Sequence, residues 1–363
     1  MNDEDYMRRA LRLARRGKNY VSPNPMVGAL VVKDGRIVGR GYHRRCGAAH
    51  AEVNAIKNAG AQAEGATLYV TLEPCCHHGQ TPPCTEFIAQ NKIARVVVGA
   101  VDTNPLVSCR GINFLRANGI EVKNSVLEKE CRELNEVFFH HMETGLPFIT
   151  LKYAQTLDGR IATSSGQSQW ISCNESLNFV HKLRAQHDAI LVGINTVIKD
   201  NPELTVRRVR GRNPLRVVVD SKLKIPRKAK VLQNIQKAGT LIATTKKASD
   251  NKCIKLAATG AAVLTCRATK RGQVDLKDLF KKLAARNISS VMIEGGSRII
   301  TAALKENLAR RLIVVIAPKI LGTGIQAVGD LNIGQLDKTK TLLVKKTWKS
   351  GQDIIIDGRL NQD

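Results

Sequence analysis

The amino-acid sequence predicts an α/β protein built from two domains. Short apolar segments typical of strands alternate with amphipathic segments typical of helices in both halves, and this pattern indicates sheets covered by helices. At 363 residues the chain is longer than one hydrophobic core usually supports. A predicted helix ends at Thr144-Gly145, a predicted strand begins after Pro147, and no internal repeat links the halves. We therefore expect two different domains, at residues 1–145 and 146–363.

The first half begins with an amphipathic helix and a hairpin. Apolar residues from Met7 to Ala14 recur at helical spacing within residues 5–16. Asp34-Gly35 is a typical hairpin turn between strands at 27–32 and 36–41. The segments that follow are expected to form a helix, a strand, a helix, a strand and two helices, at residues 50–59, 66–72, 83–91, 95–101, 111–118 and 128–141. This order predicts a mixed sheet between two helical layers.

The second half contains a further series of strand-like segments, with helices between several of them. We expect strands at residues 148–153, 189–192, 216–219, 241–244, 262–264, 291–293 and 311–318. The strand at 291–293 leads through Gly295-Gly296 into a helix at 299–306, and backbone amides at such a helix start can bind a phosphate. The turn lacks the Gly-x-Gly-x-x-Gly pattern, so a Rossmann fold is not predicted.

Basic residues greatly exceed acidic residues. The chain has 57 Lys and Arg against 31 Asp and Glu, a formal net charge of +26. A field of this sign attracts phosphorylated substrates, NADPH and nucleic acid. Aromatic residues make up only 4% of the chain, which leaves few platforms on which bases could stack. Because the basic residues are dispersed in pairs such as Lys246-Lys247, we expect a solvated basic surface without a specific nucleic-acid function.

Hydropathy and the distribution of cysteines indicate the cellular compartment that we expect for the protein. No apolar run approaches the roughly 18 residues of a membrane span, and residues 1–5, which include Asp3, Glu4 and Asp5, do not begin a signal-peptide pattern. The nine cysteines are an odd number and are scattered without framework spacing, which argues against a disulfide scaffold. We expect a cytoplasmic protein without a membrane partner.

Residues from two separated segments form a candidate zinc site. His50 offers an imidazole, and Cys75 and Cys84 offer thiolates, a set that suits tetrahedral zinc with a fourth position open for water. Zinc of this kind lowers the pKa of a bound water to roughly 7. Glu52 stands two residues after His50 at a predicted helix start, where its carboxylate can move protons without binding the metal. His-x-Glu followed by Pro-Cys and a second cysteine is the pattern of zinc deaminases that act on nucleobases.

The spacing of the two cysteines departs from that pattern. Eight residues separate them instead of two, so the polar loop at 76–83 is expected to pass over the pocket and to bind substrate. A helix beginning near Pro83 would stabilise Cys84 as a thiolate. Two simpler interpretations are core thiols and a structural zinc site, for which Cys76, His77 and His78 are candidate fourth ligands.

Four strings in the first half resemble the deaminase part of the bifunctional deaminase/reductase family of riboflavin biosynthesis. They are Pro23-Asn-Pro-Met-Val-Gly28, Gly39-Arg-Gly-Tyr-His43, His50-Ala-Glu52 and Glu73-Pro-Cys-Cys-His-His-Gly-Gln-Thr-Pro-Pro-Cys84. The resemblance implies a cytidine-deaminase-like α/β/α sandwich, zinc on His50, Cys75 and Cys84, and catalysis by Glu52. It also implies that Asn24 and His43 contact the substrate pyrimidine. Cys76 stands where the family frequently has serine, which adds a thiol beside the metal.

The resemblance continues through the second half and covers essentially the whole chain. Strings that carry it include Lys152-Tyr-Ala154-Gln-Thr-Leu-Asp-Gly159, Gly193-Ile-Asn-Thr196-Val, Asp200-Asn-Pro-Glu-Leu204-Thr-Val-Arg207 and Ile293-Glu294-Gly295-Gly296. They imply a dihydrofolate-reductase-like α/β domain that uses NADPH. The residues implied to contact NADPH are Ala154, Trp170, Thr196, Asp200, Ser221, Gly296 and Ser297. Those implied to hold the substrate are Lys152, Ser168, Arg184, Leu204, Arg207 and Glu294. Asn201 stands where the family frequently has an acidic residue.

Together the two halves imply a bifunctional enzyme that acts on phosphorylated pyrimidines. The first would deaminate 2,5-diamino-6-(5-phosphoribosylamino)pyrimidin-4-one, and the second would reduce the ribosyl group of the product to a ribityl group. Arg184 and Arg207 could each grip the phosphate bidentately, and Lys152 or a water could supply the proton of the reductive step. We also expect a homo-oligomer. Two alternatives are a nucleic-acid deaminase, which would leave the second half unexplained, and a zinc-stabilised RNA-binding protein.

Overall fold

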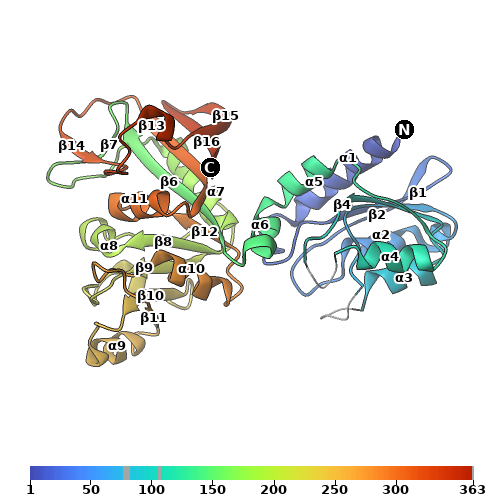
Figure 1. Cartoon of the computed structure of the whole chain (residues 1–363), viewed down its shortest axis with the longest axis horizontal. Coiled ribbons are helices and arrows are strands. Elements are labelled where there is room, and N and C mark those ends of the chain that lie inside the picture. The colour runs from blue at the N-terminus through green and yellow to red at the C-terminus, as the bar shows by residue number, and fades with distance from the viewer. Residues whose placement is uncertain (77–81, 105–107, 362–363) are drawn as a thin grey trace. The chain divides into compact units, whose positions relative to one another are not determined.

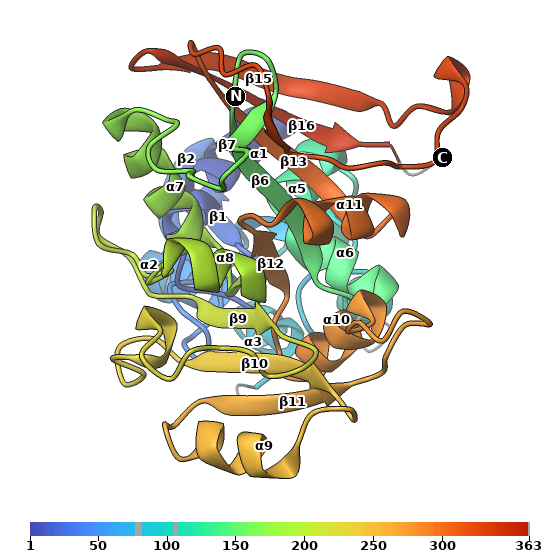
Figure 2. The ribbon, with the colours of Figure 1, turned by 90° about the vertical axis from the view of Figure 1, so that its left-hand side faces the viewer.

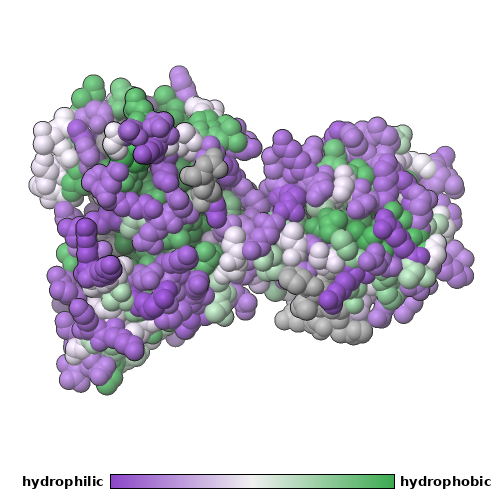
Figure 3. Space-filling model, viewed as in Figure 1, coloured by the Kyte–Doolittle hydropathy of each residue, from purple (hydrophilic) through white to green (hydrophobic). Residues whose placement is uncertain are grey.

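The computed structural model describes residues 1–76, 82–104 and 108–361. The chain folds into two compact units, which we call unit 1 (Met1–Gly145) and unit 2 (Leu146–Asp363). Each unit has its own sheet, and helices pack against both faces of each (Figure 1). Among the described residues, every helix is too short or too polar to cross a membrane. Hydrophilic residues cover most of the face shown in Figure 3, as expected for a chain with so many Lys and Arg.

Unit 1 contains the predicted mixed sheet. Its strand order is β2-β1-β3-β4-β5, with β1 antiparallel to β2 and β3, and with β3, β4 and β5 parallel. The strands are β1 (Gly28–Lys33), β2 (Arg36–Tyr42), β3 (Thr67–Leu72), β4 (Arg95–Ala100) and β5 (Glu121–Lys123). The helices are α1 (Asp3–Ala14), α2 (Ala51–Ala59), α3 (Cys84–Gln90), α4 (Arg110–Ala117), α5 (Glu128–Leu134) and α6 (Glu136–Thr144).

Alternating strand residues build two cores, one on each face of the unit 1 sheet. Ala29 and Val31 of β1 pack in the cluster that contains α2, α3 and α4. Leu30 and Val32, which point the other way, pack in the cluster that contains α1, α5 and α6. The result is an α/β/α sandwich, as the resemblance implied.

Glycines let two helices approach the β1–β2 hairpin at backbone distance. A Cβ atom placed on Gly28 would lie 2.1 Å from the carbonyl oxygen of Ala10 in α1. One placed on Gly41 would lie 2.2 Å from the carbonyl oxygen of Ala51, the first residue of α2. Because side chains cannot fit there, the hairpin fixes the height of α2 above the sheet. That height sets the positions of the residues at the start of α2.

Unit 2 is built on a nine-stranded sheet of order β11-β10-β9-β8-β12-β6-β13-β16-β15. Its strands from β11 to β13 run parallel, and β16 and β15 add an antiparallel ribbon at one edge. The strands are β6 (Phe148–Thr156), β8 (Ala189–Gly193), β9 (Leu215–Val219), β10 (Thr240–Thr245), β11 (Ala262–Cys266), β12 (Ser290–Ile293), β13 (Ala309–Ala317), β15 (Leu342–Ser350) and β16 (Asp353–Leu360). A separate two-stranded sheet pairs β7 (Arg160–Thr163) with β14 (Gly324–Gln326).

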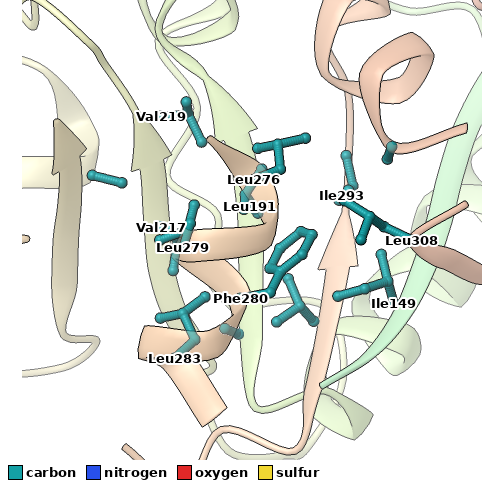
Figure 4. Packing of buried hydrophobic residues seen from close by; sticks show 14 of the residues in the cluster. Ile149, Leu191, Val217, Val219, Leu276, Leu279, Phe280, Leu283, Ile293 and Leu308 are labelled. Atoms are coloured by element: carbon teal, nitrogen blue, oxygen red, sulfur yellow. The ribbon is translucent and has the colours of Figure 1, made fainter. Parts of the chain in front are cut away.

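Helices cover both faces of the larger sheet (Figure 2). Leu191 of β8 faces a cluster with α10 and α11, in which Phe280 of α10 packs on the face of the sheet (Figure 4). Ile190 and Val192 of the same strand face the opposite cluster, which contains residues of α7, α8 and α9. The helices are α7 (Asn174–Gln186), α8 (Ile194–Asp200), α9 (Asp250–Ala257), α10 (Leu276–Ala284) and α11 (Ser297–Lys305).

The structure differs from the sequence prediction in a few elements. The single helix predicted at 128–141 is two helices, because Asn135 leaves the helical path and its side chain bonds the backbone of Met26 in both directions, at 2.8 and 2.9 Å. The short strands β5, β7 and β14 and the ribbon β15–β16 were not predicted. Most side chains of β15 are exposed, so this strand lacks an apolar pattern that could reveal it.

We predict that Gly41→Ala destabilises the protein by about 2–4 kcal/mol, because the added methyl group would overlap the backbone of α2. Thermal unfolding should show a lower melting temperature for unit 1, which contains Gly41. Gly334→Ala is the matched control, since no atom lies within 4 Å of its Cβ position. Equal stability of the two variants would contradict the close packing described above.

Candidate functional site

Three predicted ligands converge at one edge of the unit 1 sheet. His50 directly precedes α2, Cys75 follows β3, and Cys84 begins α3. The His50 Nδ1 atom lies 3.2 Å from Cys84 Sγ and 3.5 Å from Cys75 Sγ. All three candidate ligand atoms lie within 4.8 Å of one another. The two segments that carry them are therefore brought together as the sequence pattern suggested.

These distances fit a zinc ion. Tetrahedral zinc with Zn–N near 2.0 Å and Zn–S near 2.3 Å places its nitrogen and sulfur ligands about 3.5 Å apart. Within the described part of the chain, no fourth histidine, cysteine or carboxylate joins the group, and Cys76 is outside it. His77 and His78, the other candidate fourth ligands, lie outside the described residues, as does most of the loop predicted to bind substrate.

The two thiols titrate unequally. A hydrogen bond from Cys84 lowers the pKa of Cys75 to about 4, and the same hydrogen bond, together with burial, raises the pKa of Cys84. The hydrogen bond with Cys75 raises the pKa of His50 to about 8. The backbone N–H of Cys84, at the start of α3, donates to Cys75 Sγ at 3.4 Å. The start of this helix therefore stabilises a thiolate at Cys75, and not at Cys84 as predicted. A bound divalent cation would allow both thiols to ionise.

Glu52 lies in the first turn of α2 and is 4% exposed. Its Oε2 atom is buried and has no hydrogen-bond partner among the described residues. Burial raises the pKa of this carboxyl group. The Cys84 thiol bonds the same carboxyl group, so Oε2 is the oxygen left over. Because an unpartnered buried oxygen is costly, Oε2 marks a position where a proton or a ligand group completes the site.

Asn24 and His43 lie beside the same centre. Asn24 Nδ2 is 3.2 Å from His43 Nε2, and His43 Nδ1 is 3.3 Å from the carbonyl oxygen of Ala49. Burial lowers the pKa of His43, so its ring is neutral, with Nδ1–H donating to Ala49 and Nε2 accepting from Asn24. The rings of His43 and His50 are arranged edge to face, with their centroids 5.4 Å apart.

Glu73 organises the neighbouring loop, a role that the sequence analysis missed. Its carboxylate accepts the backbone N–H groups of Asp102 at 3.2 Å, Cys109 at 3.1 Å and Gly111 at 3.0 Å. It therefore ties the segment after β4 and the start of α4 to the strand end that carries Cys75. The one available signal was an acidic residue directly before Pro74 at the end of a buried strand.

Unit 2 contains a cavity of about 1130 Å³. It lies where several parallel strands end, because Thr196 follows β8, Ser221 follows β9 and Glu294 follows β12. This edge is the usual binding place in open α/β sheets. The cavity is lined by every residue predicted to contact the cofactor or substrate of this half: Lys152, Ala154, Ser168, Trp170, Arg184, Thr196, Asp200, Leu204, Arg207, Ser221, Glu294, Gly296 and Ser297.

The glycine turn before α11 fits a phosphate-bearing cofactor. Gly295 has φ +139° and Gly296 has φ +88°, and a Cβ atom on Gly296 would lie 3.4 Å from Thr196 Oγ1. No side-chain hydrogen bond caps the start of α11. Its first backbone N–H groups therefore face the cavity region without a side-chain acceptor from the described residues, as an anion-binding helix start requires.

An ion pair revises one predicted role. Arg184 donates to both carboxylate oxygens of Glu294, at 2.6 and 2.8 Å, and to the carbonyl oxygen of Thr205 at 3.0 Å. The guanidinium fork is thus already used, and Arg184 fixes Glu294 instead of offering a free grip for phosphate. Although burial opposes ionisation, Arg184 lowers the pKa of Glu294. Arg207 is half exposed and pairs with Glu203 at 3.2 Å, so it is the arginine better placed to meet a phosphate.

Other residues predicted to contact cofactor or substrate form hydrogen bonds within the lining of the cavity or pack there. Ser168 donates to Asp200 at 2.9 Å, and the Ser221 hydroxyl accepts the Val274 N–H at 3.0 Å. Leu204 is buried, whereas Trp170 is 63% exposed at the rim. Further basic residues also line the cavity: Lys199, Arg208, Lys222, Lys224, Lys230, Arg271 and Arg298.

Family models match both units. Residues 1–100 match the cytidine and deoxycytidylate deaminase zinc-binding region, and residues 147–356 match the RibD C-terminal domain. The first match covers the candidate zinc ligands, and the second covers the residues predicted for the cavity.

Relatives match the chain over nearly its whole length. The riboflavin biosynthesis protein RibD of Aquifex aeolicus is 48% identical over 355 residues, with 98% of this chain and 97% of the relative covered. RibD of Escherichia coli is 42% identical, with 89% of each chain covered. The solved structure of Acinetobacter baumannii RibD has a TM-score of 0.90 at 35% identity, with 99% of each chain covered. The chain therefore belongs to the RibD family of riboflavin biosynthesis proteins, and it carries both parts of that family on one polypeptide.

Proposed function

We propose that unit 1 hydrolyses the amine of 2,5-diamino-6-(5-phosphoribosylamino)pyrimidin-4-one and that unit 2 reduces the ribosyl group of the product with NADPH. A solved relative from Thermotoga maritima, 36% identical over 99% of each chain, is described as a diaminohydroxyphosphoribosylaminopyrimidine deaminase/5-amino-6-(5-phosphoribosylamino)uracil reductase. The observation that carries the proposal is the meeting of His50, Cys75 and Cys84 beside buried Glu52. The free cysteines suit a reducing cytoplasm.

In unit 1, His50 Nδ1 and the two thiolates would hold zinc. Bound zinc would act as a Lewis acid and lower the pKa of a water molecule toward neutrality. The Glu52 carboxylate accepts a proton from the attacking water and delivers it to the departing amine, which leaves as ammonia. Its unpartnered Oε2 atom and raised pKa suit a group that must both take up and release a proton. Asn24 and His43 orient the pyrimidine.

In unit 2, the Gly295-Gly296 turn and the start of α11 would bind a cofactor phosphate. Bound NADPH would supply a hydride. A hydride added to the sugar carbon must be matched by a proton on the neighbouring heteroatom, and Lys152 Nζ can hold that proton. Lys152 is 7% exposed, and burial lowers its pKa, which makes the proton easier to release. The charges of the Arg184–Glu294 pair act on Lys152 in opposite directions: Glu294 raises the pKa of Lys152 and Arg184 lowers it.

We predict that Glu52→Gln keeps zinc but lowers the rate of ammonia release by a factor of about 10² or more, because the amide cannot move a proton. Ammonia release from the diaminopyrimidine phosphate measures the first step. NADPH oxidation with the deaminated intermediate as substrate is the internal control, and it should be unchanged. Ammonia release at the wild-type rate would show that another group carries the proton.

Cys84→Ala should reduce the zinc content well below one ion per chain, because two ligands hold the metal far less tightly than three. Elemental analysis of the purified protein measures this. Cys76→Ala is the matched control: its thiol neighbours Cys75 in sequence but is outside the ligand group, and its zinc content should stay at the wild-type level. Loss of zinc in Cys76→Ala, or full zinc in Cys84→Ala, would contradict the ligand assignment.

Lys152→Met should lower kcat of the reductive step by a factor of about 10² while the dissociation constant for NADPH stays within a few-fold of wild type. Methionine keeps the length and the buried apolar stem of the side chain but carries no proton. Stopped-flow hydride transfer and a fluorescence titration with NADPH separate the two quantities. A change in NADPH affinity with unchanged kcat would assign Lys152 to binding instead.

A further inference from the structure

A second cavity, of about 700 Å³, lies on unit 1 between α1, α2 and the β1–β2 hairpin. None of the residues predicted for zinc binding, catalysis or substrate contact lines it. No Asp or Glu is among its lining residues, but five arginines are: Arg9, Arg12, Arg16, Arg40 and Arg44. We call this cavity the arginine groove.

The arginines of the groove come from two sides. Arg9, Arg12 and Arg16 are spaced by three and four residues, so they share one face of α1 and of the turn that follows it. Arg40 and Arg44 come from β2 and the segment after it. Their guanidinium groups have no ion pair with a carboxylate in the described ranges 1–76, 82–104 and 108–361. Like charges gathered in this way repel one another, and a bound anion would relieve the repulsion.

A neighbouring arginine shows the contrast. Arg8 belongs to the same helix but is not a lining residue, and it pairs with Glu4 at 2.7 Å and with Asp5 at 3.5 Å. The helix therefore supplies acidic partners for Arg8 but not for the arginines that face the groove. The charge of the groove is a local feature, since most of the excess of Lys and Arg in the chain lies in unit 2.

Two asparagines on α2 give the opposite wall hydrogen-bonding capacity. Asn54 Nδ2 donates to the carbonyl oxygens of Tyr42 at 3.1 Å and Ala49 at 3.2 Å, which uses both amide hydrogens and leaves Oδ1 as an acceptor. Asn58 Oδ1 accepts the N–H of Arg40 at 2.9 Å, which leaves its amide hydrogens as donors. The two residues are one helical turn apart. Together they offer an acceptor and a donor on one face, as recognition of a base edge requires.

We propose that the arginine groove binds a nucleoside di- or triphosphate, with the base against Asn54 and Asn58 and the phosphates among the arginines. The volume falls within the range of about 300–1,000 Å³ typical of small-molecule sites. Guanidinium forks match phosphate oxygens bidentately. An extended RNA would need a series of aromatic platforms, and Tyr42 is the one aromatic residue among those lining the groove. A bare polyphosphate would leave the two amides unused.

The test measures binding of ATP and GTP to the full-length protein by isothermal titration calorimetry without NADPH, which itself carries a diphosphate, and the arginine variants below separate binding in the groove from binding in the unit 2 cavity. We expect one equivalent of nucleotide to bind. The double variant Arg12→Gln/Arg16→Gln should bind at least tenfold more weakly, whereas Arg8→Gln, the matched control on the same helix, should bind within twofold of wild type. Absence of binding to the wild-type protein, or equal binding by the double variant, would overturn the proposal.

Asn58→Ala separates a nucleotide from a simple polyphosphate. This variant should bind ATP or GTP at least fivefold more weakly and inorganic tripolyphosphate as tightly as the wild-type protein does. Unchanged ATP and GTP affinity in Asn58→Ala would reduce the groove to a polyphosphate site. Binding of a 20-nucleotide RNA without binding of ATP or GTP would likewise reject a nucleotide ligand. These measurements do not depend on the deaminase or reductase activity, so their failure is distinct from failure of the proposed function.

Discussion

His50, Cys75 and Cys84 can share one metal ion only if the start of α2, the end of β3 and the start of α3 meet at one edge of the sheet. The hairpin glycines bring α2 to the sheet at backbone distance, and Glu73 holds the segment after β4 against the strand end that carries Cys75. The glycines thus set the position of α2 relative to the sheet, and the hydrogen bonds of Glu73 set the position of the segment after β4. The burial of the Glu52 carboxyl group follows from the same placement, because Glu52 lies in the first turn of α2.

Unit 2 forms its cavity from the ends of several strands. Its cavity lies at the carboxyl ends of parallel strands, where each strand delivers one side chain or turn to a common space. The glycine turn before α11 provides backbone donors, and the Arg184–Glu294 pair provides a rigid polar wall with little exposure. Replacing one residue of such a pair would leave the other as a buried charge without compensation. The charges of both residues act on the pKa of Lys152, in opposite directions.

Much of this could be predicted from the sequence, and the exceptions have physical reasons. Central strands such as β8 and β12 are buried on both faces and read as apolar runs, whereas β15 is mostly exposed and gives no such pattern. The candidate metal ligands could be predicted from residue types and spacing, and the structure brings them together. The bonds of Glu73 to the 102–111 segment and of Arg184 to Glu294 join residues far apart in sequence, so only the folded chain shows them. The break at Asn135 likewise depends on a distant partner, Met26.

The measurement that tests the account most directly is zinc-edge X-ray absorption spectroscopy on the full-length protein. We expect one zinc per chain with two sulfur ligands at about 2.3 Å, completed by nitrogen or oxygen ligands at about 2.0–2.1 Å. Replacement of His50 should change the nitrogen or oxygen shell and leave the two sulfur ligands. A shell of three or four sulfur ligands, or protein without zinc, would contradict the convergence of His50, Cys75 and Cys84 on an open metal site.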